Sequence, residues 1–295
     1  MTKYSLKFSI LVIVGAAALF LAPVESRAAS TILEDGPSCI TLGGTWDSGT
    51  LTCTLSGTLT LGPSDELAID SGVTLNVVGT VTSSGEITNK GTITNGPTGT
   101  ITTSGALTNK GIISNSGTMT NGPTGTIDNK GTIENTFTGI ITSSGNVDNT
   151  GTIDNCGLIT LSGFALVNSG TINNSDTGTI TDSIGITNKG TVTNQGVVTE
   201  SGTVINTQGE FINFAGTFAN TGTFNTGTFV DCGGIVTGIA TAILSTDCQG
   251  LTAPTIHCSF LVIPESPLGT IALIGSSLGG LGGFWAFRRF KSKQF

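Results

Sequence analysis

The 295-residue sequence has little charge and few residues that carry out chemistry. Charged residues make up 10% of the chain, well below the roughly 25% that is usual in soluble proteins. There is a single histidine, and one histidine with scattered cysteines cannot supply the ligands of a zinc finger. Proline is also rare, at 8 residues against 44 glycines, which excludes collagen and proline-rich linkers. No cofactor is expected.

Arginine is missing from the middle of the chain. All but two of the 19 acidic residues lie between residues 29 and 263, where the only cations are Lys90, Lys110, Lys130 and Lys189. This segment is therefore strongly acidic. Nucleic acids and anionic lipids bind clustered cations, so neither is expected as a partner. The expected surface is soluble, acidic and exposed to salt or cations.

Residues 1–28 are typical of a secretory signal peptide. Lys3 and Lys7 precede an apolar run from Phe8 to Ala22, and small residues suit cleavage after Ala28. A retained N-terminal anchor is the alternative, although the apolar run is short for a membrane span of about 20 residues. The mature protein is therefore expected on the outer side of the membrane.

A second apolar segment lies close to the C-terminus. The segment from Leu268 to Phe287 contains no charge, and the basic residues Arg288 and Arg289 follow it directly. Basic residues stay on the cytoplasmic side of a membrane span. The body of the protein is therefore expected outside, with a short tail inside.

A short motif precedes this segment and is made of Pro264, Glu265, Ser266 and Pro267. Motif, span and basic cluster together resemble the C-terminal sorting signals of archaeal cell-surface proteins, of the PEF-CTERM-like kind. The resemblance covers residues 264–295 and implies processing by an archaeosortase-type enzyme, which removes the tail and fixes the protein to the envelope. Ser266 stands where some members of that family have Phe, and a plain single-pass anchor is the alternative.

Between the two ends the sequence repeats. A single large apolar residue recurs about every six residues, and every third one falls 19 or 20 residues after the last. One such series consists of Ile93, Ile113, Ile133, Ile153, Ile172, Val192, Phe211 and Val230. Inserts such as NGPT at 95–98 are balanced within the same group of three units. A nearly constant sum is what a three-sided coil requires, because each coil must close on the one below.

The unit G-T-I-x-N-x fits a short strand followed by a corner. Thr, Ile and Val favour extended backbone, and the central apolar residue points inward while its neighbours point outward. Gly and Asn are expected at the corners because they tolerate the left-handed backbone conformation. Stacked coils also allow asparagine ladders, in which like amides pair along the axis. Helices are excluded by the density of glycine and β-branched residues.

The sequence therefore predicts an all-β fold, a parallel β-helix or β-solenoid with three short strands and 19–20 residues per coil. Residues 73–236 are expected to form about eight coils. Residues 29–72 are expected to cap the front end and residues 237–263 the back end, since stacked repeats need caps. A signal helix and a C-terminal transmembrane helix complete the prediction.

The repeats also resemble the β-helical repeats of filamentous-haemagglutinin-like and autotransporter adhesins. The resemblance lies in the pattern across residues 73–236 and not in a unique motif. It implies a right-handed helix. A left-handed hexapeptide helix, whose units are stricter, is the rival interpretation.

Six cysteines lie outside both terminal segments, and a secreted chain of this kind is expected to form disulfides. Cys39 and Cys53 flank a turn-rich hairpin that contains Trp46, and they are the best pair. Near the back end, where three cysteines form an odd set, Cys232 and Cys248 are the candidates. Cys156 lies about four coils, or roughly 19 Å, from Cys232, which is too far for a bond. Cys156 is expected to be a free buried thiol, with an intermolecular bond as the alternative.

The register sorts the strands into three faces, one of which is free of charge. Its strands centre on an apolar series from Val81 to Val198. The residue after each member of that series is a threonine, and these are Thr82, Thr102, Thr120, Thr142, Thr160, Thr181 and Thr199. This column resembles the ice-binding faces of some β-helical antifreeze proteins. The alternative is that threonine is simply the favoured exposed residue of a strand.

The other two faces carry acidic residues, among them Asp128 with Asp148 and Glu134 with Asp154. Either these pairs form columns that hold a cation weakly, or they are ordinary solvated surface. Polysaccharide-active enzymes on this scaffold combine carboxylates with an Arg or Lys base, whereas the four lysines here precede glycine in solvated corners. The glycosylation sequon at Asn173 is expected on a corner, where a sugar would not disturb the core.

We therefore expect a non-enzymatic surface protein that is exported, projects a rod outward and is fixed to the extracellular face of the envelope. Its expected work is adhesion, surface coating or matrix contact. Surface polysaccharide or other cell-surface proteins are the expected partners, besides the membrane or a sorting enzyme. The alternatives are a polysaccharide-active β-helix enzyme, and an ice- or glycan-binding protein that uses the threonine column. No catalytic or metal-binding residue is assigned.

Overall fold

The fold was analysed in a computed structural model, which describes residues 30–206, 209–214, 216–221, 223–225, 228–237, 243–245, 248 and 251. The expected signal peptide, residues 1–28, lies outside the described residues, and so do the sorting motif, the C-terminal apolar segment and the basic tail. Within the described ranges, no helix is long and apolar enough to cross a membrane.

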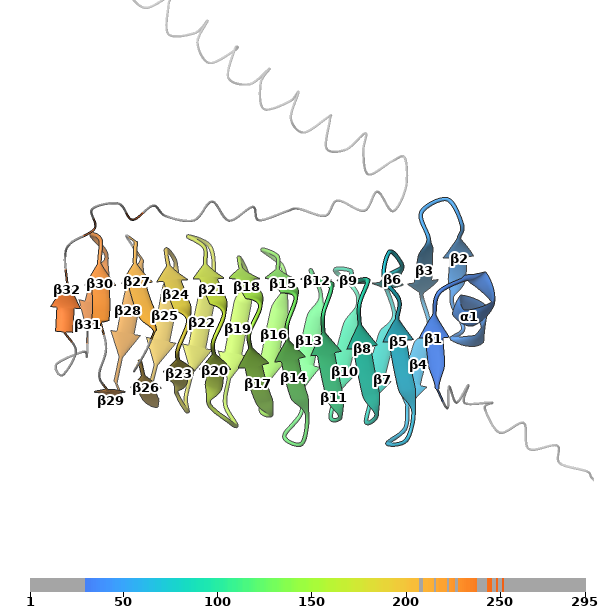
Figure 1. Cartoon of the computed structure of the whole chain (residues 1–295), viewed down its shortest axis with the longest axis horizontal. Helices are drawn as coiled ribbons and strands as arrows, with labels where there is room; N and C mark the ends of the chain where they lie inside the picture. Colours follow the sequence, from blue (N-terminus) through green and yellow to red (C-terminus); the bar gives the residue numbers. More distant parts are fainter. Residues whose placement is uncertain are drawn as a thin grey trace, which may run out of the picture.

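Nearly all of the described chain forms short parallel strands in three sheets, called A, B and C here (Figure 1). Sheet A consists of β1 (Thr31–Leu33), β5 (Glu66–Ile69), β8 (Glu86–Asn89), β11 (Ala106–Asn109), β14 (Thr126–Asn129), β17 (Asn146–Asn149), β20 (Leu166–Asn168), β23 (Ile186–Asn188), β26 (Thr203–Ile205) and β29 (Thr223–Asn225). Sheet B consists of β2 (Thr45–Asp47), β3 (Thr52–Leu55), β6 (Thr74–Val77), β9 (Thr92–Asn95), β12 (Ile112–Asn115), β15 (Thr132–Asn135), β18 (Thr152–Asn155), β21 (Thr171–Asn174), β24 (Thr191–Asn194), β27 (Glu210–Asn213), β30 (Thr228–Asp231) and β32 (Ile243–Ser245). Sheet C consists of β4 (Thr58–Leu61), β7 (Thr80–Ser83), β10 (Thr100–Thr103), β13 (Thr118–Asn121), β16 (Ile140–Ser143), β19 (Leu158–Leu161), β22 (Thr179–Asp182), β25 (Val197–Glu200), β28 (Thr217–Asn220) and β31 (Ile235–Thr237).

The chain visits sheets C, A and B in turn, so every third strand stacks on the same sheet. Ile93 pairs with Ile113, and Ile113 pairs with Ile133, as the apolar series predicts. The predicted three-sided β-solenoid is therefore confirmed, with about nine turns. The strands β3, β4 and β5 already make one coil before residue 73. The right-handed sense stays a prediction.

Most four-residue strands turn their second and fourth residues inward, and these two positions hold different kinds of residue. The second residue is apolar and fills a single continuous core, to which residues from Leu33 to Phe229 contribute. At the back end the core widens into a cluster in which the rings of Phe211, Phe218 and Phe229 lie 4.8–5.2 Å apart between centroids. These three rings thicken the core in this part of the solenoid.

The fourth residue is most often a buried asparagine, and these asparagines form two ladders. In each ladder the Nδ2 group donates to the Oδ1 atom of the asparagine one coil on, at 2.7–2.9 Å. The ladder of sheet A contains Asn89, Asn109, Asn129, Asn149, Asn168, Asn188 and Asn206. The ladder of sheet B contains Asn95, Asn115, Asn135, Asn155, Asn174, Asn194 and Asn213. The predicted ladders are therefore confirmed.

Each ladder amide also satisfies the backbone at the next corner. Asn109, for example, donates from Nδ2 to Asn129 and also to the carbonyl of Thr132, which begins the following strand one coil on. One buried side chain therefore joins two coils and two sheets. A buried amide without such partners would cost about 1–3 kcal/mol.

Most corners do not use the left-handed backbone conformation, so that expectation was wrong for most of the solenoid. Among the described residues, positive φ occurs at Leu51 and at four glycines, and none of the ladder asparagines has it. Glycine is required at most corners for another reason, which is close approach. A Cβ atom on Gly111 would lie 2.0 Å from the carbonyl oxygen of Gly91 one coil below, and one on Gly131 would lie 2.1 Å from that of Gly111.

A small cap covers the front end. The hairpin of β2 and β3 is antiparallel and places Trp46 opposite Cys53, as expected. Helix α1 (Gly36–Thr41), which the sequence did not predict, begins with a capping box between Asp35 and Ser38. The predicted disulfide joins Cys39 of α1 to Cys53 of β3, with a Cα–Cα distance of 5.5 Å. The helix therefore stays fixed over the first coil (Figure 1).

The second predicted disulfide, between Cys232 and Cys248, is also present, with a Cα–Cα distance of 5.8 Å. The expectation of a free thiol at Cys156 was wrong, because this buried residue is disulfide-bonded. No free cysteine occurs in the part of the chain that the structure describes.

The ladder yields a direct test. Replacing Asn129 by alanine removes one of the two acceptors of Asn109 Nδ2. It also removes the donor to Asn149 Oδ1 and to the Thr152 carbonyl, and it opens a small cavity. We expect the free energy of unfolding to fall by about 2–4 kcal/mol, measured by urea or thermal unfolding followed by circular dichroism. Asn146→Ala, at an exposed outward position of β17, is the matched control. Equal stability of the two variants would contradict a structural role for the ladder.

Candidate interaction surface

The seven predicted threonines lie in one column on the outside of sheet C. Each pairs with the next, from Thr82 on β7 through to Thr199 on β25. The column begins one coil earlier, with Thr60 on β4, and continues through Ala219 on β28 to Thr237 on β31. Strand spacing of about 4.8 Å along the axis therefore sets the repeat of hydroxyl groups.

A second outward column runs beside it and is partly apolar. It contains Thr58, Thr80, Thr100, Thr118, Ile140, Leu158, Thr179, Val197, Thr217 and Ile235. Ile140, Leu158 and Val197 are 37–39% exposed. None of the outward residues on the described strands of sheet C is charged. We call the two columns together the threonine face.

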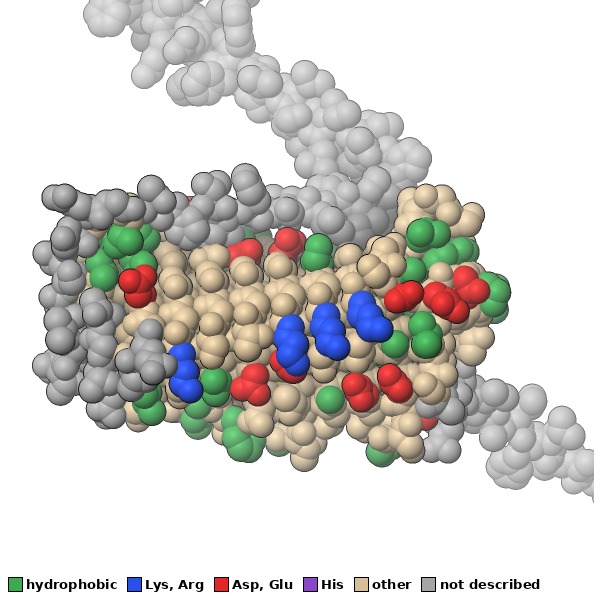
Figure 2. Space-filling view, in the orientation of Figure 1, with side chains coloured by type: hydrophobic (Ala, Val, Ile, Leu, Met, Phe, Trp, Pro, Cys, Tyr) green, Lys and Arg blue, Asp and Glu red, His purple; other side chains and the backbone are tan. Residues whose placement is uncertain are grey.

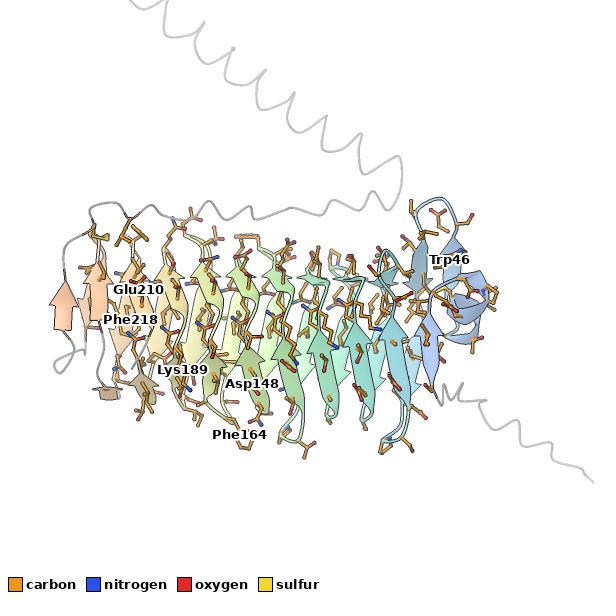
Figure 3. The ribbon with its side chains drawn as sticks, in the orientation of Figure 1. Trp46, Asp148, Phe164, Lys189, Glu210 and Phe218 are labelled. Atoms are coloured by element: carbon orange, nitrogen blue, oxygen red, sulfur yellow. A yellow bond between two sulfur atoms is a disulfide. The ribbon has the colours of Figure 1, made fainter. Side chains whose placement is uncertain are left out.

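Exposed apolar residues also stand at both edges of the threonine face. Phe137 lies in the turn that enters β16, and its side chain is 54% exposed. On the opposite edge, Phe164 and Ile184 lie in turns that leave sheet C, and they are 52% and 41% exposed. Phe164 points away from the coils at the rim of the rod (Figure 3). The strands of the threonine face are thus free of outward charge, and its edges carry apolar side chains together with the exposed Asp176 in the turn that enters β22.

The other two faces hold the charges. The expected acidic columns are present, since Asp128 pairs with Asp148 and Glu134 with Asp154. Burial, and then the neighbouring carboxylate of Asp154, raises the pKa of Glu134. Lys130 forms an ion pair with Asp128. The lysines line one corner of the rod with acidic residues beside them (Figure 2), and all four are exposed turn residues, as expected.

The sequon residue Asn173 does not lie on a corner, which corrects the expected position. It is a half-buried outward residue of β21, and its Nδ2 group donates to Asp154 Oδ1 at 2.8 Å. The neighbouring Asn174 is a buried member of the sheet B ladder. A glycan on Asn173 would therefore displace a hydrogen bond between two coils.

At the third corner, between sheets C and A, no continuous asparagine ladder forms among the described residues. The inward fourth residues of sheet C are Ser83, Thr103, Asn121, Ser143, Leu161, Asp182, Glu200 and Asn220. Two acids thus follow one another, and Asp182 pairs in register with Glu200. The side chain of Glu200 is 0% exposed and that of Asp182 is 1% exposed. Sequence reasoning missed this pair, although both acids directly follow members of the threonine column.

The buried environment of Asp182 and Glu200 raises the pKa of both carboxyl groups. Burial raises the pKa of Glu200 to about 9, and the nearby Asp182 carboxylate adds to the effect. Burial also raises the pKa of Asp182, while hydrogen bonds from the backbone N–H groups of Ile184 and Gly185 oppose that rise. Glu200 therefore holds its proton at neutral pH in the folded protein when no cation is bound.

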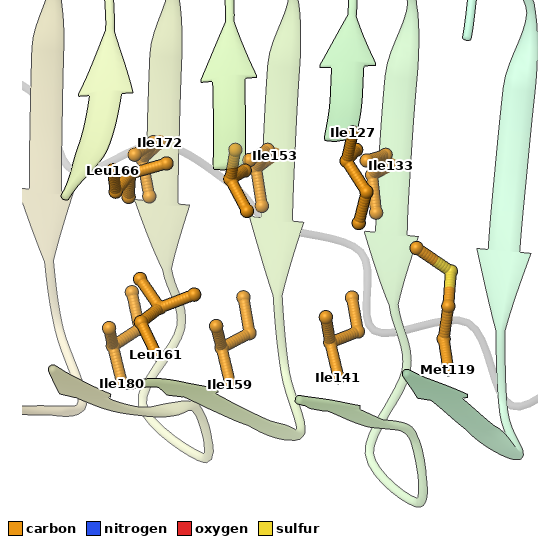
Figure 4. Close-up of a pocket in the computed structure, with 11 residues that line it drawn as sticks. Met119, Ile127, Ile133, Ile141, Ile153, Ile159, Leu161, Leu166, Ile172 and Ile180 are labelled. Atoms are coloured by element: carbon orange, nitrogen blue, oxygen red, sulfur yellow. The ribbon is translucent and has the colours of Figure 1, made fainter. Parts of the chain in front are cut away.

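The interior contains a cavity of about 30 Å³, lined by apolar side chains of all three sheets between Met119 and Ile180. Isoleucines from facing strands point toward one another across it (Figure 4). The cavity follows from packing β-branched residues at the centre of a wide coil, and no polar group lines it. It has no features of an active site.

Comparison with protein families decides the relationship of this chain. The haemagglutinin repeat matches residues 41–117, 111–153 and 165–227, more than half of the chain. The chain belongs to the haemagglutinin repeat family. Neither curated proteins nor solved structures give a significant match.

Membership in the haemagglutinin repeat family agrees with the β-solenoid and with an adhesin-like surface protein. The matched repeats cover most strands of the threonine face and both asparagine ladders. They also include the acidic pair Asp182 and Glu200, which breaks the third corner. In this haemagglutinin-repeat protein, the threonine face is therefore the candidate surface for binding a partner.

The buried acid predicts a pH-dependent stability with a definite sign. The unfolded chain releases the Glu200 proton near pH 4.5, whereas the folded protein holds it to about pH 9. The contribution of Glu200 to stability is therefore fully present below about pH 4.5 and is lost as the pH rises toward 9. Glu200→Gln places an uncharged side chain at this position and so removes the loss of stability on ionisation. The variant should be more stable than the wild type by about 3 kcal/mol at pH 7 in buffer with a chelator.

Thermal unfolding of the wild type and of Glu200→Gln, measured at a series of pH values between 4 and 9, gives the pH dependence of the stability of each protein. Glu86→Gln, at an exposed outward position of β8, is the matched control and should keep the wild-type profile. If Glu200→Gln and the wild type change in parallel with pH, Glu200 is not the buried acid described here.

Proposed function

We propose that the protein is a non-enzymatic, adhesin-like surface protein that contacts uncharged partner surfaces through the threonine face. The observation that carries the proposal is the face itself, on which the outward residues of ten strands are threonine, alanine or aliphatic. Charged side chains attract water and oppose desolvation, so their exclusion from one face favours contact there. Family membership supports the same conclusion.

The chemistry of the face favours a flat, neutral and repetitive partner such as a surface polysaccharide. Hydroxyl and methyl groups of threonine repeat at about 4.8 Å, so a regular polymer can make the same contact many times. The aliphatic residues Ile140, Leu158 and Val197 add apolar area against which sugar rings can pack. Other neutral surfaces, including ice and cell-surface proteins, are outcomes that the binding experiment separates.

Export and anchoring complete the proposal. The sequence of residues 1–28 supports secretion, and Pro264 to Pro267 with the following apolar segment supports attachment to the envelope. The rod then stands on the extracellular face with its back end nearest the membrane. Because the C-terminal tail resembles an archaeosortase-type signal, we propose that this tail is removed during attachment.

Mass spectrometry of the mature protein, extracted from envelopes of the source cells, tests the anchoring. We expect an N-terminus at Ala29 and a chain that ends before Leu268, because processing would remove the signal peptide and the tail. Replacing Arg288 and Arg289 by glutamate should leave unprocessed chains, since the basic cluster orients the span. A mature protein that retains Met1 and is recovered from the cytosol would contradict secretion.

A pair of lysine substitutions tests the threonine face. Thr120→Lys combined with Thr142→Lys places two adjacent cations in the centre of the column, where they pair in register. We expect binding of the recombinant ectodomain to insoluble neutral polysaccharides and to glycan arrays to fall at least tenfold, because a charge must be desolvated in the contact.

The matched control is Thr88→Lys combined with Thr108→Lys, an in-register pair on the outside of sheet A. Circular dichroism and thermal unfolding of both variants verify that the fold is retained. A thermal-hysteresis measurement in parallel distinguishes ice from glycan as the partner. If both double variants bind as the wild type does, the threonine face is not the contact surface.

A further inference from the structure

The buried acids Asp182 and Glu200 interrupt the pattern of donors that joins coils elsewhere. At the other two corners an asparagine amide donates its N–H groups to the next coil. A carboxyl group has one O–H donor when it is protonated and none when it is ionised. Neither Asp182 nor Glu200 donates a hydrogen bond to the other coil among the described residues. The contact between these two coils at this corner therefore lacks the bridge that the ladders provide elsewhere.

The carboxylate oxygens at this corner are largely unpaired. Asp182 Oδ1 accepts from the backbone N–H groups of Ile184 and Gly185, at 2.8 and 3.0 Å. Asp182 Oδ2 and both Glu200 Oε atoms are buried and have no hydrogen-bond partner within the described ranges. The ion pair recorded in those ranges, Lys130 with Asp128, involves neither acid. Three orphaned carboxylate oxygens thus meet in one buried place.

The neighbouring sheet is weakly joined beside the pair. Strands β23 and β26 of sheet A follow the two acids, and they share a single in-register pair, Thr187 with Ile205. The pair before it in the stack, β20 with β23, shares three. The backbone is nevertheless tightly packed there, since a Cβ on Gly185 would lie 1.9 Å from the Thr203 carbonyl oxygen. Asn188 joins these two coils at the far end of β23, whereas the corner between sheets C and A has no such side-chain bridge beside the weakly paired strands.

We propose that Asp182 and Glu200 bind a Ca²⁺ ion, which bridges two successive coils at the corner between sheets C and A. Two carboxylates carry the charge that one divalent cation neutralises, and oxygen-only donors select hard cations. Ca²⁺ accepts irregular geometry and backbone carbonyl ligands, whereas Mg²⁺ requires an octahedron and keeps several waters, for which a tightly packed corner has little room.

Backbone carbonyls and water must supply the remaining ligands. The described residues contain no group of three or more His, Cys, Asp or Glu side chains placed to hold a metal. The pair lies in the body of the rod and on the inside of sheet C, so this site is separate from the threonine face and independent of the proposed function. Its role is to take the place of the asparagine bridge between coils.

Calcium titration of the full protein tests the proposal. The protein is first stripped with EGTA, and CaCl₂ is then added in isothermal titration calorimetry and in thermal unfolding at pH 7.5. We expect one ion per chain and a rise in melting temperature of several degrees. MgCl₂, and NaCl at matched ionic strength, should give much smaller shifts. No heat and no change in melting temperature on adding CaCl₂ would overturn the proposal, as would an equal shift with NaCl or MgCl₂.

Variants locate the ion. Glu200→Gln and, separately, Asp182→Asn should each weaken calcium binding at least tenfold, and Glu200→Gln should unfold at a higher temperature than the stripped wild type. Glu134→Gln, in the outward register pair with Asp154, is the matched control and should bind calcium as the wild type does. If Glu134→Gln abolishes the calcium response and Glu200→Gln retains it, the ion lies on the outer acidic column and the proposal is wrong.

Discussion

The structure depends on the buried amide-to-amide hydrogen bond between successive coils. Its geometry allows one fixed rise per coil, because Nδ2 and Oδ1 must meet at 2.7–2.9 Å in every repeat. A slip of one residue would place the asparagines outside and the outward threonines inside. The ladders therefore set the register that the apolar column alone, which tolerates exchanges among Ile, Leu, Val and Met, would specify less strictly.

Because the register is fixed, the residue types that recur in the sequence determine the chemistry of each face of the rod. Since every coil repeats the same outward positions, a preference for threonine in one short strand becomes a column along the rod. By the same rule, the outward acids of the strands lie on the other two faces, and the four lysines lie in the turns between sheets A and B. The third corner is the exception, because its inward position varies in chemistry and includes two acids. The inward positions of sheets A and B are thus repetitive, because the coils stack through them. The inward fourth position of sheet C departs from the repeat, and there two acids are buried.

Much of this could be predicted from the sequence because the period is visible in it. The apolar series, the threonine column and the pairs Cys39–Cys53 and Cys232–Cys248 were all predicted correctly. The corner conformation was not, since asparagine and glycine suit both a left-handed turn and a buried, closely packed corner. The burial of Glu200 was not predicted, because the inward fourth position of sheet C varies in residue type and has no repeating residue that marks it in the sequence. Register identifies neighbours, whereas burial at a corner depends on how tightly the chain turns.

The most direct test of the account measures the rise per coil along the threonine face. Spin labels are attached to cysteines introduced at Thr82 and Thr181, which lie five coils apart in register. Pulsed electron–electron double resonance should place these labels about 24 Å apart. Labels at Thr82 and Thr199 should lie about 29 Å apart, one strand spacing more. Two narrow distributions that differ by about 5 Å would support the stacked register. Broad distributions, or equal distances for the two pairs, would contradict it.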